Sequence, residues 1–156
     1  MDLRTVLVAL AHLALAGIGA WLIVIDARMH RLPNRIVLPT LGGLLVLVLL
    51  DAVVTGGTLS LVRALLGALI LGGFYAVLRL VSPAGMGGGD VKLAVVIGLL
   101  LGWHGWQELA VGAASAFVLG ALYALMLIVL RRADGKTRIA FGPWMIAGAV
   151  MGILSG

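Results

Sequence analysis

The sequence predicts an all-α polytopic membrane protein, folded as a compact bundle of six transmembrane helices. Of its 156 residues 63% are apolar, and the mean hydropathy is +1.22, whereas a soluble domain is about half apolar. The apolar segments are long and continuous, unlike the alternating strands of about ten residues that build a membrane β-barrel. Together these observations indicate spanning helices.

Six apolar segments alternate with short polar or glycine-rich loops. A helix needs about 20 apolar residues to cross a bilayer, and the expected spans cover residues 3–25, 36–54, 59–81, 90–102, 109–130 and 139–154. The first is interpreted as a retained span and not a signal peptide. Small residues recur four apart in three spans, namely Gly98/Gly102, Gly112/Ala116/Gly120 and Gly148/Gly152. This spacing favours close helix packing within one integral-membrane domain over residues 1–156.

The distribution of charge predicts orientation. The net charge is +5, and the loops after the first, third and fifth spans hold most basic residues: Arg28, Arg31, Arg35, Arg79, Lys92, Arg131, Arg132, Lys136 and Arg138. Basic loops remain in the cytoplasm, so we expect both termini outside and these loops at the cytoplasmic face of the inner membrane. Because the basic residues lie between spans, we expect the lipid bilayer and no nucleic acid as a partner.

Cysteine is absent from the sequence. This excludes structural disulfides, a thiol nucleophile and any zinc or iron–sulfur site with cysteine ligands. No metal site is visible in the sequence, and we expect no cofactor.

An irregular segment meets a membrane helix at Asp90. Four of the five residues 85–89 are glycine, which loses much backbone entropy on ordering and so disfavours a helix. We therefore expect a loop over residues 82–89, a span that begins at Asp90 or Val91, and glycines that let another backbone approach. An acid in a membrane segment is costly and usually functional, although Asp90 is also suited to be the N-cap of its span.

Asp26 is the natural partner of Asp90. The six acids are Asp2, Asp26, Asp51, Asp90, Glu108 and Asp134; only Asp26 and Asp90 stand at span–loop junctions on the cytoplasmic side, where the bundle can bring them together. Two facing carboxyl groups at low dielectric share one proton. The ionised member can then take a proton from water while the protonated member polarises a carbonyl. This chemistry is aspartyl peptide hydrolysis without a covalent intermediate.

Other interpretations of these residues stay open. Intramembrane acids also serve proton-coupled transporters, although no chain of acids or histidines leads from Asp26 and Asp90 to the outer side. A non-enzymatic scaffold is a third class, with Asp26 facing headgroups. We expect Lys92 to snorkel to lipid phosphates and His12 to be a packed, hydrogen-bonded histidine. His30 is four residues from Asp26 and would be its neighbour if the helix continues, but a solvated loop histidine is favoured.

Three motifs carry a family resemblance. They are Asp26-x5-Leu32-Pro33-Asn34, then Gly87-Gly88-Gly89-Asp90-x-Lys92-Leu93, and then Phe141-Gly142-Pro143. In this order, on six spans, the sequence resembles the type IV prepilin peptidases, membrane aspartyl peptidases with a Gly-x-Gly-Asp motif. The resemblance implies that Asp26 and Asp90 are catalytic. It leaves Pro33, Gly87, Gly89 and Lys92 as loop or substrate-binding residues, and gives Pro143 no catalytic role.

The resemblance also implies a substrate. The family cuts the short basic leader from prepilin or pseudopilin precursors at the cytoplasmic face, commonly after a glycine. Larger members carry an N-terminal cytoplasmic domain with paired cysteines that methylates the new amino terminus. With no cysteine here, the sequence resembles the peptidase-only form, and we expect no S-adenosylmethionine-dependent methylation. The archaeal preflagellin peptidases are close relatives and remain an alternative.

The length of the fourth span predicts a recessed site. Residues 90–102 make roughly 20 Å of helix at about 1.5 Å per residue, against a hydrocarbon core of about 30 Å. If Trp103 and Trp106 mark the outer interface, Asp90 lies roughly 10 Å below the inner one, in a pocket that water reaches. Asp26 would start nearer the surface, so the two acids would approach when the loops rearrange or substrate binds.

Overall fold

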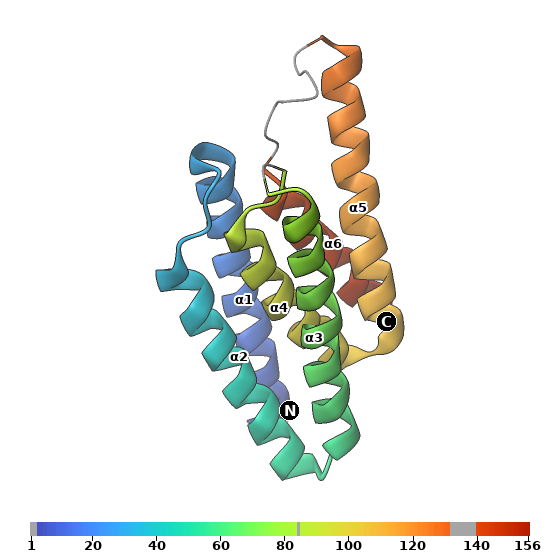
Figure 1. The fold of residues 1–156 in the computed structure, drawn as a ribbon. Coiled ribbons are helices and arrows are strands. Elements are labelled where there is room, and N and C mark those ends of the chain that lie inside the picture. Colours follow the sequence, from blue (N-terminus) through green and yellow to red (C-terminus); the bar gives the residue numbers. More distant parts are fainter. Residues whose placement is uncertain (1–2, 84, 132–139) are drawn as a thin grey trace.

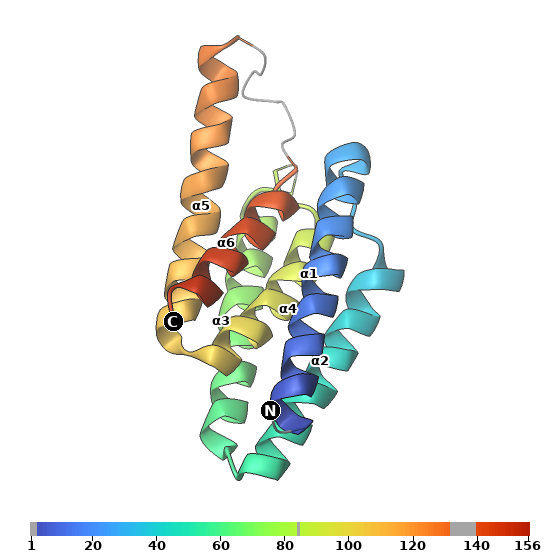
Figure 2. The same ribbon diagram turned by 180° about the vertical axis from the view of Figure 1, so that it is seen from behind.

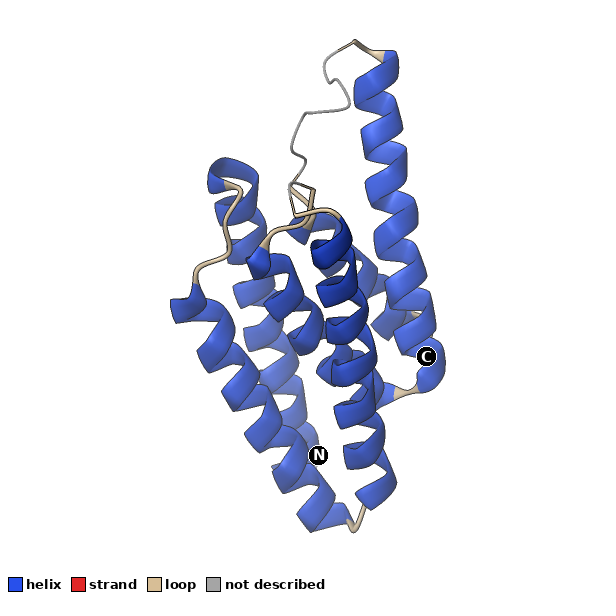
Figure 3. Ribbon diagram, in the orientation of Figure 1, coloured by secondary structure: helices blue, strands red, loops and turns tan. Residues whose placement is uncertain are grey.

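The computed structural model describes residues 3–83, 85–131 and 140–156, and its regular structure in these ranges is helical (Figures 1 and 3). The helices are α1 (Leu3–Met29), α2 (Asn34–Thr55), α3 (Thr58–Val81), α4 (Gly88–His104), α5 (Trp106–Val129) and α6 (Gly142–Leu154). The expected start of the sixth span at Ile139 and much of the most basic loop, including Arg132, Asp134, Lys136 and Arg138, lie outside the described residues, as does Asp2.

Four helices are long and apolar enough to cross a membrane. They are α1, α2, α3 and α5, whereas α4 has 17 residues and α6 has 13. The all-helical class is therefore confirmed, together with several membrane-spanning helices.

Two predicted helix boundaries near the acids were wrong. Helix α1 continues past Asp26 to Met29, so Asp26 lies inside a helix and does not end it. Helix α4 begins at Gly88, so two of the loop glycines form helix after all. Its first turn is fixed by a hydrogen bond from the Gly87 N–H to the Asp90 carboxyl group, which offsets part of the entropy that glycine loses.

Helix α4 is the core of the bundle. Every residue from Val96 to Trp103 is buried, and α2, α3, α5 and α6 all contact it; seen from behind, α6 crosses between α5 and α1 (Figure 2). A helix that is apolar on all sides is expected at such a central position. Because α4 begins at Gly88, this central position fixes where Asp90 lies.

The small-residue spacing does bring helix backbones together. A Cβ atom built on Gly67 of α3 would overlap the Gly98 carbonyl oxygen of α4, and one on Gly102 would lie 3.2 Å from the Gly67 Cα. Likewise, a Cβ on Gly148 of α6 would lie 2.5 Å from the Gly112 oxygen of α5. The predicted close packing is confirmed at both crossings.

A matched pair of α3 variants tests this packing. Gly67→Ala should push α3 away from α4 and lower the unfolding temperature in detergent, because overpacking typically costs about 1–3 kcal/mol. Gly73→Ala is the control, since a Cβ there meets nothing within 4 Å, and removing a helical glycine is neutral or slightly stabilising. Equal melting temperatures for the two variants would contradict the close-contact account.

The far end of α4 differs from the prediction. Trp103 is only 8% exposed, so it does not mark the outer interface, and its indole N–H donates to Asp51 Oδ2 at 3.0 Å. Arg63 closes the helix end: its Nε donates to the Gly102 carbonyl, and its Nη2 to those of Trp103 and His104, at 2.8–2.9 Å. Helix α4 stops well short of the α2–α3 turn (Figures 1 and 2). Helix α4 is therefore shorter than α2 and α3 at this end, while the depth of Asp90 below the membrane surface stays a prediction.

Candidate active site

Asp26 and Asp90 line the same cavity, as the sequence predicts. This cavity of about 330 Å³, called the catalytic cavity after the role that the sequence predicts for it, lies where the α1–α2 and α3–α4 loops meet. Its lining residues are Asp26, His30, Arg31, Leu32, Arg79, Pro83, Met86, Gly87, Gly88, Gly89 and Asp90. Both carboxyl groups are buried, at 4% and 8% exposure, and they lie within electrostatic range of each other. No rearrangement is needed to bring the two acids to one site.

Asp26 is held by the start of α6. Its Oδ2 accepts the Gly142 backbone N–H at 3.0 Å. Gly142 is the first residue of α6, where N–H groups lack partners within the helix and the helix dipole favours an acidic group. Asp26 therefore links α1 to α6 while presenting its carboxyl group to the catalytic cavity.

Gly142 is a candidate site residue that the sequence analysis quoted in the third motif but gave no role. A Cβ atom on Gly142 would lie 2.5 Å from Asp26 Oδ2 and 3.1 Å from its Cγ, so only glycine lets Asp26 come this close. The preceding Phe141 packs against Tyr75 and Phe117, with ring centroids 6.0 and 5.4 Å apart, which orients the Gly142 N–H. The sequence held one signal: Pro143 has no N–H, so Gly142 supplies the donor at this helix start.

Asp90 also accepts a backbone N–H at a helix start, in this case that of its own helix α4. Gly87 is the N-cap, and Asp90 stands three positions later and accepts the Gly87 N–H through Oδ2 at 2.9 Å. The prediction of Asp90 as the N-cap was wrong, because α4 starts earlier than expected; Asp90 instead stabilises the helix start from the third helical position. Both carboxyl groups are therefore oriented by a backbone N–H at the start of a helix.

The loop glycines allow the close approach that the sequence predicts. A Cβ on Gly89 would lie 2.7 Å from the Leu32 Cβ and 3.2 Å from its N, and a Cβ on Gly88 would overlap the Arg79 guanidinium. None of the described glycines in this loop has a positive φ angle. Glycine is needed here for space, and Leu32 closes the cavity from the α1–α2 loop.

Pro33 and Lys92 lie outside the cavity lining. Pro33 is the N-cap of α2 in an extended conformation, and its carbonyl accepts the N–H groups of Ile36 and Val37. Lys92 Nζ donates to Asn34 Oδ1 at 2.6 Å, a contact with α2 that the sequence interpretation did not include; its interaction with lipid headgroups stays a prediction. Both residues therefore fix the loop that carries Leu32, and Asn34 was missed as the partner of Lys92.

Basic residues beside the acids were also missed. Arg79, His30 and Arg31 line the catalytic cavity, with Arg79 within electrostatic range of Asp90 and His30 of Asp26. The sequence interpretation placed Arg79 among the cytoplasmic loop residues and gave it no role at the site. For His30 both open interpretations hold: it follows the last residue of α1 with a φ of 50°, its side chain is exposed, and it still lies near Asp26 because α1 continues past that residue.

Comparison with known proteins agrees with the geometry of this site. Residues 13–125 match the type IV leader peptidase family, so the chain belongs to that family, and the resemblance seen in the motifs is confirmed. The matched residues include both acids, and the Asp26–Gly142 hydrogen bond ties them to the third motif, which lies beyond the match.

Several relatives are named prepilin leader peptidase/N-methyltransferase. That of Aeromonas salmonicida is 33% identical over 148 residues, covering 94% of this chain and 50% of the relative. That of Dickeya chrysanthemi is 34% identical over 149 residues, covering 95% and 51%, and that of Bacillus subtilis is 33% identical over 81 residues, covering 52% and 32%. The chain thus spans about half the length of the first two relatives. No solved structure matches it significantly.

Proposed function

We propose that this chain is a membrane-embedded aspartyl endopeptidase that removes the leader peptide of type IV prepilins or pseudopilins. The observation that carries the proposal is the meeting of Asp26 and Asp90 in one cavity, each oriented by a backbone N–H at a helix start. Membership of the type IV leader peptidase family supplies the substrate class.

The geometry supports a reaction in which the two acids divide the work. At close range the pair favours one ionised and one protonated carboxyl group. The ionised group takes a proton from a water molecule, which attacks the scissile carbonyl, while the protonated group donates to the carbonyl oxygen. A proton then passes to the leaving amine, so the peptide bond is hydrolysed with no covalent enzyme intermediate.

The placement of charge supports a cytoplasmic active site. Arg28, Arg31, Arg35 and Arg79 surround the cavity end of the bundle, at the ends of α1 and α3 and the start of α2. Both marked chain ends point away from that end (Figure 1). By the positive-inside rule, this favours six passes of the inner membrane, with both termini outside and the cavity facing the cytoplasm.

The experiment is co-expression with a leader-bearing precursor in cells that lack their own leader peptidase. Mass spectrometry should show a prepilin or pseudopilin shortened by its leader and carrying an unmethylated amino terminus. Offering a preflagellin precursor in parallel distinguishes the archaeal-type specificity. An intact precursor beside correctly inserted chain would contradict the proposal, and proton flux without cleavage would favour the transporter class.

A further inference from the structure

Two histidines meet at the end of the bundle away from the catalytic cavity. His12 of α1 and His104, the last residue of α4, have their Nε2 atoms 3.0 Å apart and their ring planes at 89°. Each ring also contacts a backbone carbonyl through Nδ1: His12 that of Val8 at 2.7 Å, and His104 that of Leu100 at 2.9 Å. A carbonyl oxygen can only accept, so both Nδ1 atoms must be the donors.

The number of hydrogen bonds that the two rings make indicates that the pair carries one extra proton and so a positive charge. The two rings make three hydrogen bonds, and each bond needs one proton. Two neutral imidazoles carry only two protons, so every neutral arrangement leaves two lone pairs facing each other at 3.0 Å or less. We propose that His12 and His104 share a third proton between their Nε2 atoms, and that this cationic bridge positions α1 against α4 for the proposed peptidase reaction.

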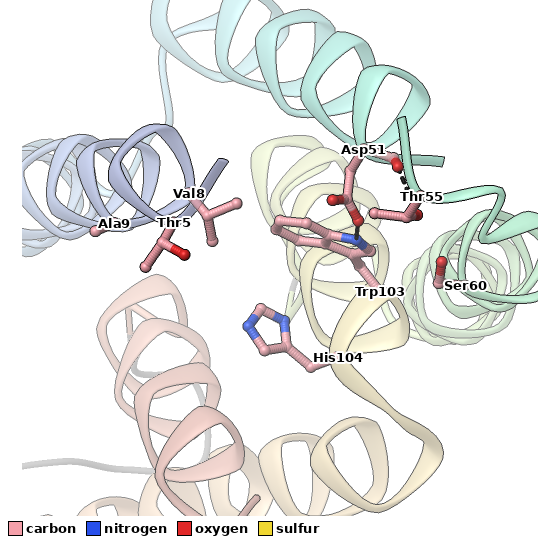
Figure 4. Close-up of a pocket in the computed structure, with 8 residues that line it drawn as sticks. All are labelled: Thr5, Val8, Ala9, Asp51, Thr55, Ser60, Trp103 and His104. Atoms are coloured by element: carbon pink, nitrogen blue, oxygen red, sulfur yellow. Dashed lines mark hydrogen bonds between the residues drawn. The ribbon is translucent and has the colours of Figure 1, made fainter. Parts of the chain in front are cut away.

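A buried carboxyl side chain and a cavity lie beside this bridge. A cavity of about 500 Å³ between α1, α2, α3 and α4 is lined by Thr5, Val8, Ala9, Asp51, Thr55, Ser60, Trp103 and His104 (Figure 4). Asp51 is 8% exposed, and its partner Trp103 stacks on the His12 ring with centroids 6.0 Å apart. An acidic side chain and room for water beside the pair are compatible with the positive charge that the shared proton would bring.

The other charges near the pair are accounted for element by element. Asp51 faces the cavity from α2. Arg63 of α3 directs its guanidinium to the carbonyls at the end of α4, including that of His104. Glu108, in the first turn of α5, packs against Gly105, and the described residues of α6 have no ionisable side chain. Among the described residues, Asp51 is therefore the acidic group nearest to the bridge by way of Trp103 and the shared cavity.

The bridge matters because α1 is weakly packed. Only 11% of its apolar segment is buried, against 28% for α2 and for α3. An apolar crevice of about 110 Å³ lies between the middle of α1 and helices α4 and α6, lined among others by Leu15, Ile18, Leu100 and Ile153. Polar contacts hold α1 at two levels, through His12 to α4 and through Asp26 to α6.

These contacts connect the bridge to the candidate catalytic pair. Helix α1 carries His12 and Asp26, whereas α4 carries His104 and Asp90. The shared proton therefore joins the two acid-bearing helices, so loss of this proton lets α1 tilt and moves Asp26 relative to Asp90. The bridge forms at lower pH and is lost as the pH rises.

Nuclear magnetic resonance tests the shared proton without any assay of cleavage. The chain has three histidines, so ¹⁵N-histidine labelling in nanodiscs gives few signals. Two rings should show protonated Nδ1 atoms and intermediate Nε2 shifts, and His12→Gln should change the titration of His104 while His30→Gln leaves it unaltered. A His104 titration that is indifferent to His12→Gln would overturn the proposal.

Spin labels test the positioning. The cysteine-free chain accepts labels at Met29→Cys and Val81→Cys, which are 66% and 79% exposed at the cavity ends of α1 and α3; α3 reports on α4 because their backbones touch. The label-to-label distance should change as the pH rises in the chain with both histidines and stay constant in His12→Gln, whose amide can donate to His104 without a charge. Identical pH responses would contradict a positioning role.

The pH profile of cleavage completes the test and rests on the proposed function. Both proteins carry Asp26 and Asp90 and differ only at residue 12, so the ratio of the cleavage rate of the unmodified chain to that of His12→Gln reports on the bridge. The ratio should fall by about tenfold as the pH rises. A charged hydrogen bond is roughly twice as strong as a neutral one, and a difference of about 1.4 kcal/mol changes an equilibrium constant tenfold. A constant ratio would refute the role in catalysis, whereas absence of cleavage in every variant would refute the proposed function and leave the spectroscopic results to decide the bridge.

Discussion

Asp26→Asn and Asp90→Asn should each abolish leader cleavage. Asparagine keeps an oxygen that can accept the backbone N–H of Gly142 or Gly87, so the helix starts that hold these side chains remain intact. It cannot exchange a proton with water or with the scissile carbonyl. Because general acid–base catalysis contributes about 10²–10⁴-fold to a rate, and the two acids work as a unit, we expect a loss of at least about 10³-fold in either variant.

Glu108→Gln is the control for this loss. It also removes a carboxyl group, but Glu108 lies at the start of α5 and is not among the residues that line the catalytic cavity. Mass spectrometry of a co-expressed precursor measures cleavage, and the amount of inserted protein is measured beside it. Near-normal processing by either aspartate variant would refute the catalytic pair.

Gly142→Ala should also impair cleavage, although it leaves both carboxyl groups in place. The added Cβ would lie 2.5 Å from Asp26 Oδ2, a distance that forces the carboxyl group away from α6 and from its place in the cavity. A displacement of about 1 Å can cost on the order of 10²-fold in rate, so we expect a fall of about 10–100-fold.

Gly17→Ala is the matched control, because Gly17 lies in α1 with Asp26 and a Cβ there meets nothing within 4 Å. Initial rates for the two variants at equal amounts of folded protein provide the measurement. If Gly142→Ala cleaves at the rate of Gly17→Ala, then Asp26 does not depend on the start of α6, and our account of its orientation is wrong.

The sequence predicts the helices of this fold well because each apolar segment is continuous. Composition alone gives the class, and spacing of small residues gives the contacts of Gly98 and Gly148. It predicts helix starts less well where glycines are involved: Gly88 and Gly89 enter α4 because Asp90, Leu32 and Arg79 surround them. Such contacts come from other segments and are not visible in local propensity.

The candidate site shows the same contrast between features that local sequence predicts and features that depend on distant segments. Asp26 and Asp90 can be paired from the sequence, because acids in membrane segments are costly and few. The hydrogen bond from Gly142 to Asp26 joins residues 116 positions apart, and the one from Trp103 to Asp51 joins residues 52 positions apart. Contacts between such distant residues are not visible in the local sequence. Since tryptophan is common both at membrane interfaces and in buried hydrogen-bonded positions, its sequence context alone favoured the wrong interpretation.

The most direct test of the central claim uses the purified chain reconstituted in lipid nanodiscs with a purified precursor and nothing else. Mass spectrometry follows the precursor over a time course, beside Asp26→Asn and Asp90→Asn proteins prepared in the same way. The account predicts that the unmodified chain releases the intact leader as one peptide and that both variants leave the precursor whole. A folded, unmodified chain that leaves the precursor uncut, or an aspartate variant that cuts it, would contradict the claim that Asp26 and Asp90 together form a peptidase site.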